Sequence, residues 1–207
     1  MLAAKPELSA HEAAAVGDEA RLMAWVKEQP ELLEAYSHDG FTPLQLGAFF
    51  SHADVVKFCL ARGANANAVS RNPMQLRALH SSTAANHIPI TKLLLANGAE
   101  VNAKQSGGFT PIHAAAQNGN TEMTKLLLDW GADPSAKTDE GRSAKDFAAE
   151  GKHDAVIALL DAKLFTPRID HVEWRTRDLK CLHAFIQGVF GWQFEAFGES
   201  YFFTRPA

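Results

Sequence analysis

The sequence predicts a mainly α-helical solenoid of about five helix pairs joined by hairpin loops, with a small β-α-β-β segment at its C-terminal end. Three observations favour this fold class. Residues 40–68 return in similar form at residues 108–136, with apolar residues at helical spacing in each copy. Three glycines close successive units at intervals of 35 and then 33 residues, which indicates a stacked repeat. After Leu164 the helical pattern stops and a strand-like alternation begins.

Composition and charge narrow the classes of partner. With 207 residues, 46% of them apolar, the chain can bury one or two compact cores. The formal net charge of −4 gives no broad cationic field, so neither nucleic acid nor a membrane is an expected partner. No apolar run is long enough for a signal peptide or a membrane span, which predicts a cytoplasmic protein. Cys59 and Cys181 fall in different predicted domains and are expected to be reduced thiols.

Three central repeats, at residues 39–71, 72–106 and 107–139, are each predicted to fold as a helix pair. In two of them a threonine, Thr42 or Thr110, is placed to cap the first helix. Proline follows in the first turn, where no amide hydrogen is needed. Small residues then let the paired helices approach, and a glycine or asparagine turns the chain into the second helix. Each second helix carries apolar residues at helical spacing and ends before a glycine suited to a C-cap.

Two degenerate copies, at residues 8–38 and 140–163, are predicted to cap the stack, so that the repeat domain spans residues 1–163. A terminal repeat has only one neighbour and faces water on its other side. This explains Leu8 at the position of the motif threonine, and Lys145 at a position that is apolar in the central repeats.

The period near 33 residues and the motifs GFTPLQ at Gly40 and GFTPIH at Gly108 resemble the ankyrin repeat family. The resemblance extends over residues 8–163. It implies a solenoid that holds a protein partner on its hairpin tips and on the concave face of its first helices. It also implies a protein–protein interaction module with no catalytic residues and no cofactor.

Two features of the central repeats are candidates for partner contact. The hairpin at residues 70–77 is two residues longer than the next one, and we expect it to project from the row. It either contacts a partner or is a tolerated loop insertion. Phe49 and Phe50 either anchor a partner or pack on the preceding repeat, and packing is the favoured interpretation. The residues proposed for partner contact are Phe41, Phe49, Phe50, Arg71, Asn72, Met74, Arg77, Phe109, Gln117 and Asn118.

Nine histidines raise the question of a metal site, and the repeat accounts for six of them. Three share the fourth position of the repeat motif, and three follow the turn between the paired helices. Metal-ligand spacing is absent among them. We therefore expect structural hydrogen bonds from these side chains. The six are His11, His80, His113, His52, His87 and His153.

The tail follows a different pattern. Residues 164–168 are expected to form a linker, and residues 169–207 a strand, a helix and two further strands. The HVEW sequence at His171, the capping Asp178 and the VFGWQF junction resemble the start of the glyoxalase/bleomycin-resistance/extradiol-dioxygenase superfamily, the vicinal oxygen chelate fold. The resemblance implies an incomplete domain in which His171 stands at a metal-ligand position of the family. A divalent metal is expected only in a complete domain of this kind.

Two functions follow from these resemblances. The first is a non-enzymatic interaction module. The alternative is the N-terminal part of a fusion whose complete form carries a metal-dependent domain, lactoylglutathione-lyase-like or dioxygenase-like, that the repeats bring to a partner. The sequence contains no nucleophile elbow, phosphate loop or paired-cysteine motif, which favours the first function.

Overall fold

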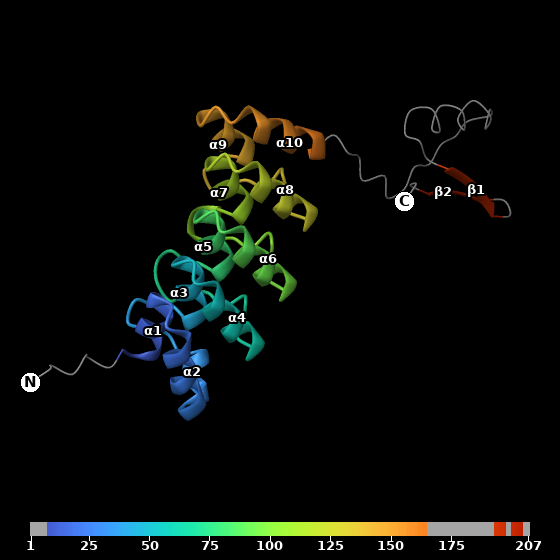
Figure 1. Cartoon of the computed structure of the whole chain (residues 1–207). Coiled ribbons are helices and arrows are strands. Elements are labelled where there is room, and N and C mark those ends of the chain that lie inside the picture. The colour runs from blue at the N-terminus through green and yellow to red at the C-terminus, as the bar shows by residue number, and fades with distance from the viewer. Residues whose placement is uncertain (1–7, 165–192, 198–199, 205–207) are drawn as a thin grey trace, which may run out of the picture. The chain divides into compact units, whose positions relative to one another are not determined.

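The computed structural model of the chain describes residues 8–164, 193–197 and 200–204 (Figure 1). The chain divides into two compact units, at residues 1–166 and 167–207. The described part of the first unit is built from helices joined by loops, and that of the second unit is a pair of strands.

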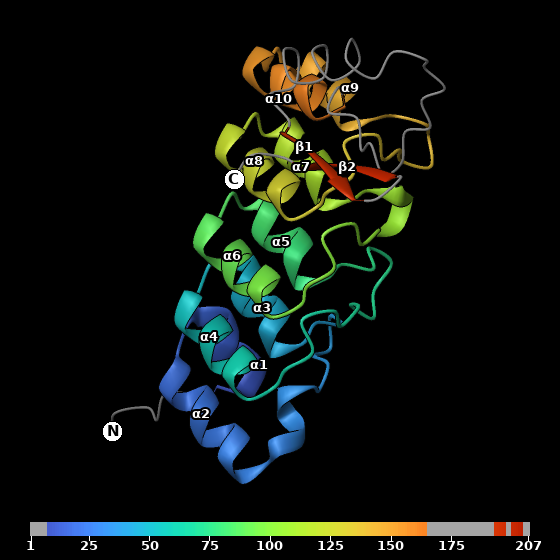
Figure 2. The same cartoon turned by 90° about the vertical axis from the view of Figure 1, so that its right-hand side faces the viewer.

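Ten α-helices in the described part of the chain form five successive pairs, which confirms the mainly helical prediction. Odd-numbered helices stack in one layer and even-numbered helices in a second layer (Figures 1 and 2). The helices are α1 (Ala10–Val16), α2 (Glu19–Glu28), α3 (Pro43–Phe49), α4 (Ala53–Ala61), α5 (Ala78–Ala84), α6 (Ile88–Ala96), α7 (Pro111–Gln117), α8 (Thr121–Asp129), α9 (Ala144–Glu150) and α10 (Asp154–Leu164), with short 3-10 helices η1 (Pro30–Leu33) and η2 (Ser106–Gly108) in the loops.

Capping side chains decide where the first helices begin. Before α3, the hydroxyl of Thr42 accepts the backbone N–H of Gln45 at 3.3 Å, and the Gln45 side chain accepts the Thr42 N–H at 2.9 Å. This reciprocal arrangement satisfies two amide groups that a helix start would leave unpaired. In α1 the same arrangement is made by Ser9 and Glu12. The helix therefore starts after Ser9, and Leu8, at the motif position of the threonine, is not the cap.

The hydrophobic core lies between the two layers. Alanines of the first helices, such as Ala48 and Ala115, are fully buried and let the layers approach closely. A Cβ added at Gly47 would lie only 2.7 Å from Cγ1 of Val55 in α4, so a larger residue at that position would push the layers apart. The largest buried side chains include Leu94, at the centre of the stack in α6.

One side chain, half-buried in the first pair and buried in the next three, ties each of the first four helix pairs to the loop that follows it. Nε2 of His80 donates to the carbonyl oxygen of Ala103 at 2.9 Å, while Nδ1 accepts the backbone N–H of Arg77 at 3.2 Å. This pair of bonds requires the neutral ring with its proton on Nε2. Equivalent bonds to a carbonyl 23 or 24 residues further along the chain are made by His11, Gln45 and His113.

The other three repeat histidines also bond the backbone, which confirms the structural role expected for all six. His52 reaches the carbonyl oxygen of Ala15 in the preceding pair at 3.0 Å, and His153 reaches that of Gln117, also in the pair before its own, at 3.2 Å. His87 accepts the N–H of Ile90 at the start of α6. The ring of His52 also explains Gly17, which has a φ of +79°, because a Cβ there would lie 2.6 Å from Nδ1.

In the second unit, β1 (Gln193–Phe197) pairs antiparallel with β2 (Ser200–Thr204), and Phe194 is opposite Phe203 in the register. These strands fall where the sequence predicts the last two strands of the tail. The strand and helix expected before them lie outside the described residues. The four-element segment therefore stays a prediction.

Replacing Leu94 tests the register of the stack. Leu94 is fully buried, so Leu94→Ala in the whole chain should lower the free energy of unfolding by about 2–5 kcal/mol. Lys92, exposed on the same helix, gives the control: Lys92→Ala should cost less than about 0.5 kcal/mol. Urea unfolding followed by circular dichroism measures both. Equal costs for the two variants would show that the register is wrong.

The buried histidines make stability depend on pH. Burial lowers the pKa of His80 from its ordinary 6.5 to about 4, although its bond to the Ala103 carbonyl acts in the opposite direction. Burial also lowers the pKa of His113. A histidine whose pKa is lowered by folding binds fewer protons in the folded chain than in the unfolded one. The stability that His80 contributes is therefore complete above about pH 6.5 and is lost as the pH falls towards 4.

Gln45 suggests how to remove this dependence, because it makes the same two bonds with a group that does not titrate. For wild type, His80 should account for about 1–2 kcal/mol of lost stability between pH 7 and pH 5. His80→Gln should flatten the pH profile by that amount in urea unfolding series. Ala96→Gln, at an exposed position of α6 with no titratable side chain, is the control and should leave the slope unchanged. If the His80→Gln variant kept the wild-type slope, His80 would not be the source of the pH dependence of stability.

Candidate partner-binding groove

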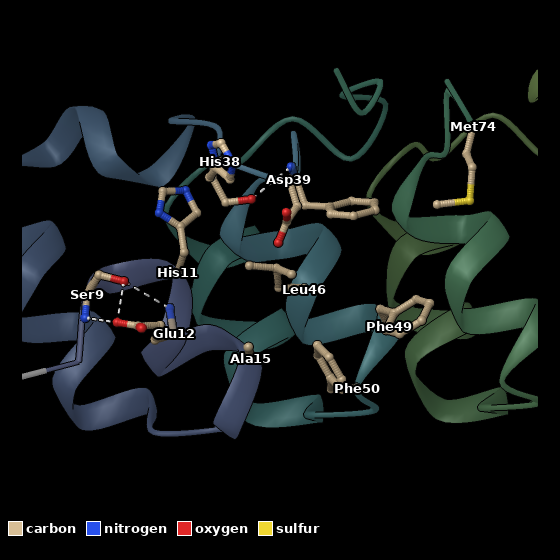
Figure 3. A pocket seen from close by; sticks show the side chains of 12 residues that line it. Ser9, His11, Glu12, Ala15, His38, Asp39, Leu46, Phe49, Phe50 and Met74 are labelled. Atoms are coloured by element: carbon tan, nitrogen blue, oxygen red, sulfur yellow. Dashed lines mark hydrogen bonds between the residues drawn. The ribbon is translucent and has the colours of Figure 1, made fainter. Parts of the chain in front are cut away.

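Two hollows lie on the layer of first helices and share the side chain of Phe49. The first, which we call the aromatic hollow, has a volume of about 560 Å³ and lies where α1 and α3 meet the first two hairpins (Figure 3). The second has a volume of about 320 Å³ and lies over α5 and α7. We call it the polar hollow after the serine, threonine, glutamine and histidine side chains that line it beside apolar ones. Together they form the groove. The aromatic hollow is lined by Ser9, His11, Glu12, Ala15, Ser37, His38, Asp39, Phe41, Leu46, Phe49, Phe50 and Met74.

The aromatic hollow exists because neighbouring repeats differ in size at one helix position. Phe49 ends α3, whereas the equivalent residue of α1 is Ala15. Phe49 and Phe50 remain 51% and 49% exposed, and their rings meet edge to face with centroids 5.1 Å apart. About half of each residue is therefore uncovered, and Ala15 of the preceding repeat lines the same hollow. Ala15 is too short to cover the rest.

The long second hairpin contributes Met74 to the same hollow, with 51% of the residue exposed. Its backbone is bonded on both sides. The N–H of Arg71 donates to the carbonyl of Gly40 at 2.8 Å, and the carbonyl of Met74 accepts the N–H of Ser106 at 3.1 Å. The second hairpin is thus bonded to the hairpin on each side of it, and its projection from the row stays a prediction.

The small side chains of Ala84 and Ala114 keep the polar hollow open. Ala84 occupies in α5 the position that Phe49 occupies in α3, and Gln117 holds it in α7. Ala114, expected to help the paired helices approach, is only half-buried and lies in this hollow. Phe109 stands beside it, with its ring centroid 5.4 Å from that of Phe147. The lining residues are Phe49, Leu76, His80, Ser81, Ala84, Gln105, Ser106, Phe109, Thr110, Ala114 and Gln117.

Four of the residues predicted to contact a partner lie outside both hollows, and each is engaged within the chain. The guanidinium carbon of Arg71 lies 4.1 Å from the centre of the Tyr36 ring, a cation–π contact. Arg77 donates to the carbonyl of Lys104 at 3.0 Å, and its side chain is only 20% exposed. The remaining two, which donate to backbone carbonyls of the preceding repeat, are Asn72 and Asn118.

The structure brings the other six predicted residues to the groove. The sequence analysis treated the first repeat only as a cap and did not predict that it lines the groove. The contrast between Ala15 and Phe49 could have indicated this, because a small residue beside a large one leaves a hollow. The six are Phe41, Phe49, Phe50, Met74, Phe109 and Gln117. The charged or titratable lining residues that sequence reasoning did not name are His11, Glu12 and His38 of the first repeat and Asp39, which begins the second.

The described residues offer little for metal or thiol chemistry. Among them, no group of three or more histidine, cysteine, aspartate and glutamate side chains is suited to hold a metal ion. Burial raises the pKa of the Cys59 thiol to about 12, which makes this thiol unreactive. His171 and Cys181 lie outside the described residues, and their roles stay predictions. Within the same limits, the helices are too short or too polar to cross a bilayer.

Two family models match the chain. One, described as ankyrin repeat, matches residues 39–71, and another, described as ankyrin repeats (many copies), matches residues 76–128. They support an ankyrin repeat protein, and ankyrin repeats indicate a protein–protein interaction module. Neither match includes residues 169–207. The resemblance of that segment to the vicinal oxygen chelate superfamily, and the enzyme alternative that depends on it, stay predictions.

Among curated proteins, the chain is similar to alpha-latrocrustotoxin-Lt1a of Latrodectus tredecimguttatus, with 33% identity over 78 residues. The match covers 38% of the chain, and the chain spans about 5% of the length of that relative. So small a share of the relative gives no argument about the partner of this chain.

Proposed function

We propose that the chain binds a protein partner through the groove, with an apolar side chain of the partner seated in the aromatic hollow. The observation that carries this proposal is the exposure of three large apolar residues, Phe49, Phe50 and Met74, around one hollow. Surfaces that gather such side chains without covering them commonly bind another protein.

Burial of these rings is the main source of affinity in the proposal. About half of each phenylalanine is uncovered. Covering on the order of 100 Å² of apolar surface per ring gives roughly 2 kcal/mol each before any ordering cost. Aromatic residues at the centre of a concave contact are typical binding hot spots. We therefore place the energetic centre of the contact at Phe49 and Phe50.

The hollow is also formed before a partner arrives. Phe49 is the last residue of α3, and Phe50 is its C-cap. The backbone N–H of Phe50 donates to the carbonyl of Leu46 at 2.9 Å, so the helix holds the backbone of both aromatic residues in place. Met74 is held by the bonded backbone of the second hairpin. A preformed surface loses little conformational entropy on binding, which favours affinity.

The polar hollow extends the proposed contact along the first helices. Gln117 is exposed at its edge, and the half-buried Gln105 lies on the adjoining hairpin. Amide side chains of this kind pair with the backbone of an extended peptide. A partner segment that leaves the aromatic hollow in this direction would exchange apolar contacts for hydrogen bonds.

The layer of second helices is a weaker candidate. Its exposed large apolar residues in the described structure are Met23 in α2 and Trp130 after α8. The intervening pairs α3–α4 and α5–α6 separate them along the stack. Single exposed apolar residues are normal on protein surfaces.

The proposal is tested with peptides selected from a displayed random library against the whole chain. Phe49→Ala and Phe50→Ala should each weaken the enriched peptides by about 5–30-fold, because each removes a ring at the centre of the contact. Trp130→Ala is the matched control, since this ring is 48% exposed and lies outside the groove. Isothermal titration gives the affinities, and urea unfolding shows that the variants stay folded. Full affinity in both phenylalanine variants would refute the proposal.

A further inference from the structure

Two carboxylates lie on the rim of the aromatic hollow, those of Glu12 in α1 and Asp39 in the first hairpin. Among the described residues that line it, none is lysine or arginine, and the other groups able to carry charge are the rings of His11 and His38. The His11 ring is held by its bond to the carbonyl of Ala35. Arg71, on the second hairpin, is held over the Tyr36 ring and does not line the hollow. The rim is therefore acidic around an apolar floor.

The Asp39 carboxylate is available to a partner. The residue is exposed, and its carboxylate makes no hydrogen bond or ion pair with any described residue. Its position is nevertheless fixed, because its backbone carbonyl accepts the side-chain amide of Asn72 at 3.1 Å. Figure 3 shows Asp39 on the hairpin above Leu46, on the same side of α3 as the aromatic pair.

Glu12 is a second fixed negative charge. Its Oε2 atom accepts both the backbone N–H of Ser9, at 2.8 Å, and the Ser9 hydroxyl, at 2.9 Å (Figure 3). The backbone hydrogen bond from Ser9, followed by the hydroxyl bond, lowers the pKa of Glu12. Oε1 has no hydrogen-bond partner among the described residues. One oxygen thus caps α1 while the other faces solvent at the rim.

We propose that the aromatic hollow selects a partner segment in which an apolar side chain lies next to a lysine or arginine. This inference rests on the proposed function. The apolar side chain covers Phe49 and Phe50, and the cationic group lies at the rim by Asp39 and Glu12.

Charge complementarity decides against the other classes of occupant. An acidic peptide or a nucleic acid phosphate would bring like charge to Asp39 and Glu12. A purely apolar segment would leave both carboxylates beside a low-dielectric contact without compensation. Because the rim is open to water, the charges contribute modestly to affinity and more to association rate and salt dependence.

The first experiment repeats the library selection on the whole chain and on Asp39→Asn in parallel. For wild type we expect enriched peptides with lysine or arginine within two residues of an aromatic, leucine or methionine residue. The basic residue should lose its enrichment on Asp39→Asn. Enrichment of peptides without a basic residue, or with acidic residues, on the wild-type chain would overturn the inference.

The second experiment is a double-mutant cycle on one enriched peptide and its lysine-to-glutamine version. Asp39→Asn should weaken the lysine peptide about two- to fivefold and leave the glutamine peptide unchanged. Glu140→Gln is the matched control, because Glu140 also precedes a glycine at an exposed hairpin tip and lines neither hollow. A loss of the same size for both peptides, or in Glu140→Gln, would contradict the inference.

A third measurement uses only the wild-type chain and so does not depend on how Asp39→Asn folds. The association rate of the lysine peptide should fall as salt rises from about 50 to 500 mM, and that of the glutamine peptide should change less. Identical salt dependence for both peptides would overturn the inference. Phe49→Ala separates the two proposals: loss of binding there with no charge effect anywhere leaves the proposed function standing and removes only the choice of partner.

Discussion

A side-chain N–H donated to a backbone carbonyl of the following loop is the contact on which the rest of this stack depends. His11, His80, His113 and Gln45 each make it. The bond satisfies a carbonyl that is at least half-buried in every case, and it fixes the loop relative to the first helix. Because the hairpins are placed in this way, the first two of them frame the aromatic hollow at one end of the helices.

Repetition of this tie leaves other positions free to vary without loss of the fold. The last turn of each first helix is one such position, occupied in successive repeats by Ala15, Phe49, Ala84 and Gln117. Differences in size between neighbours then create relief on an otherwise regular surface. The groove therefore arises from variation between repeats, and the core that supports it is common to all of them.

Shape and charge have separate roles at the aromatic hollow. The uncovered rings supply apolar area, which sets how tightly a segment of any suitable size is held. The carboxylates on the rim affect the choice of partner segment and its association rate. The Glu12 carboxylate has two roles, because it takes part in the cap of α1 and also places a negative charge at the rim. Within the described part of the chain the Asp39 carboxylate makes no hydrogen bond or ion pair, so we assign to it the larger part of the selection.

The sequence by itself determined the repeats and their local mechanics. These include the period near 33 residues, the cap at Thr42 and the hydrogen-bonding role of the histidines. Each depends on neighbouring residues or on the position within the repeat, and the sequence shows both directly. Tertiary structure decided which exposed residues meet. Arg77 bonds the carbonyl of Lys104, and Met74 of the second hairpin lines the same hollow as Phe49 of α3. The residues of each pair are about 25 or more positions apart in the sequence, and only the stacking of one repeat on the next brings them together.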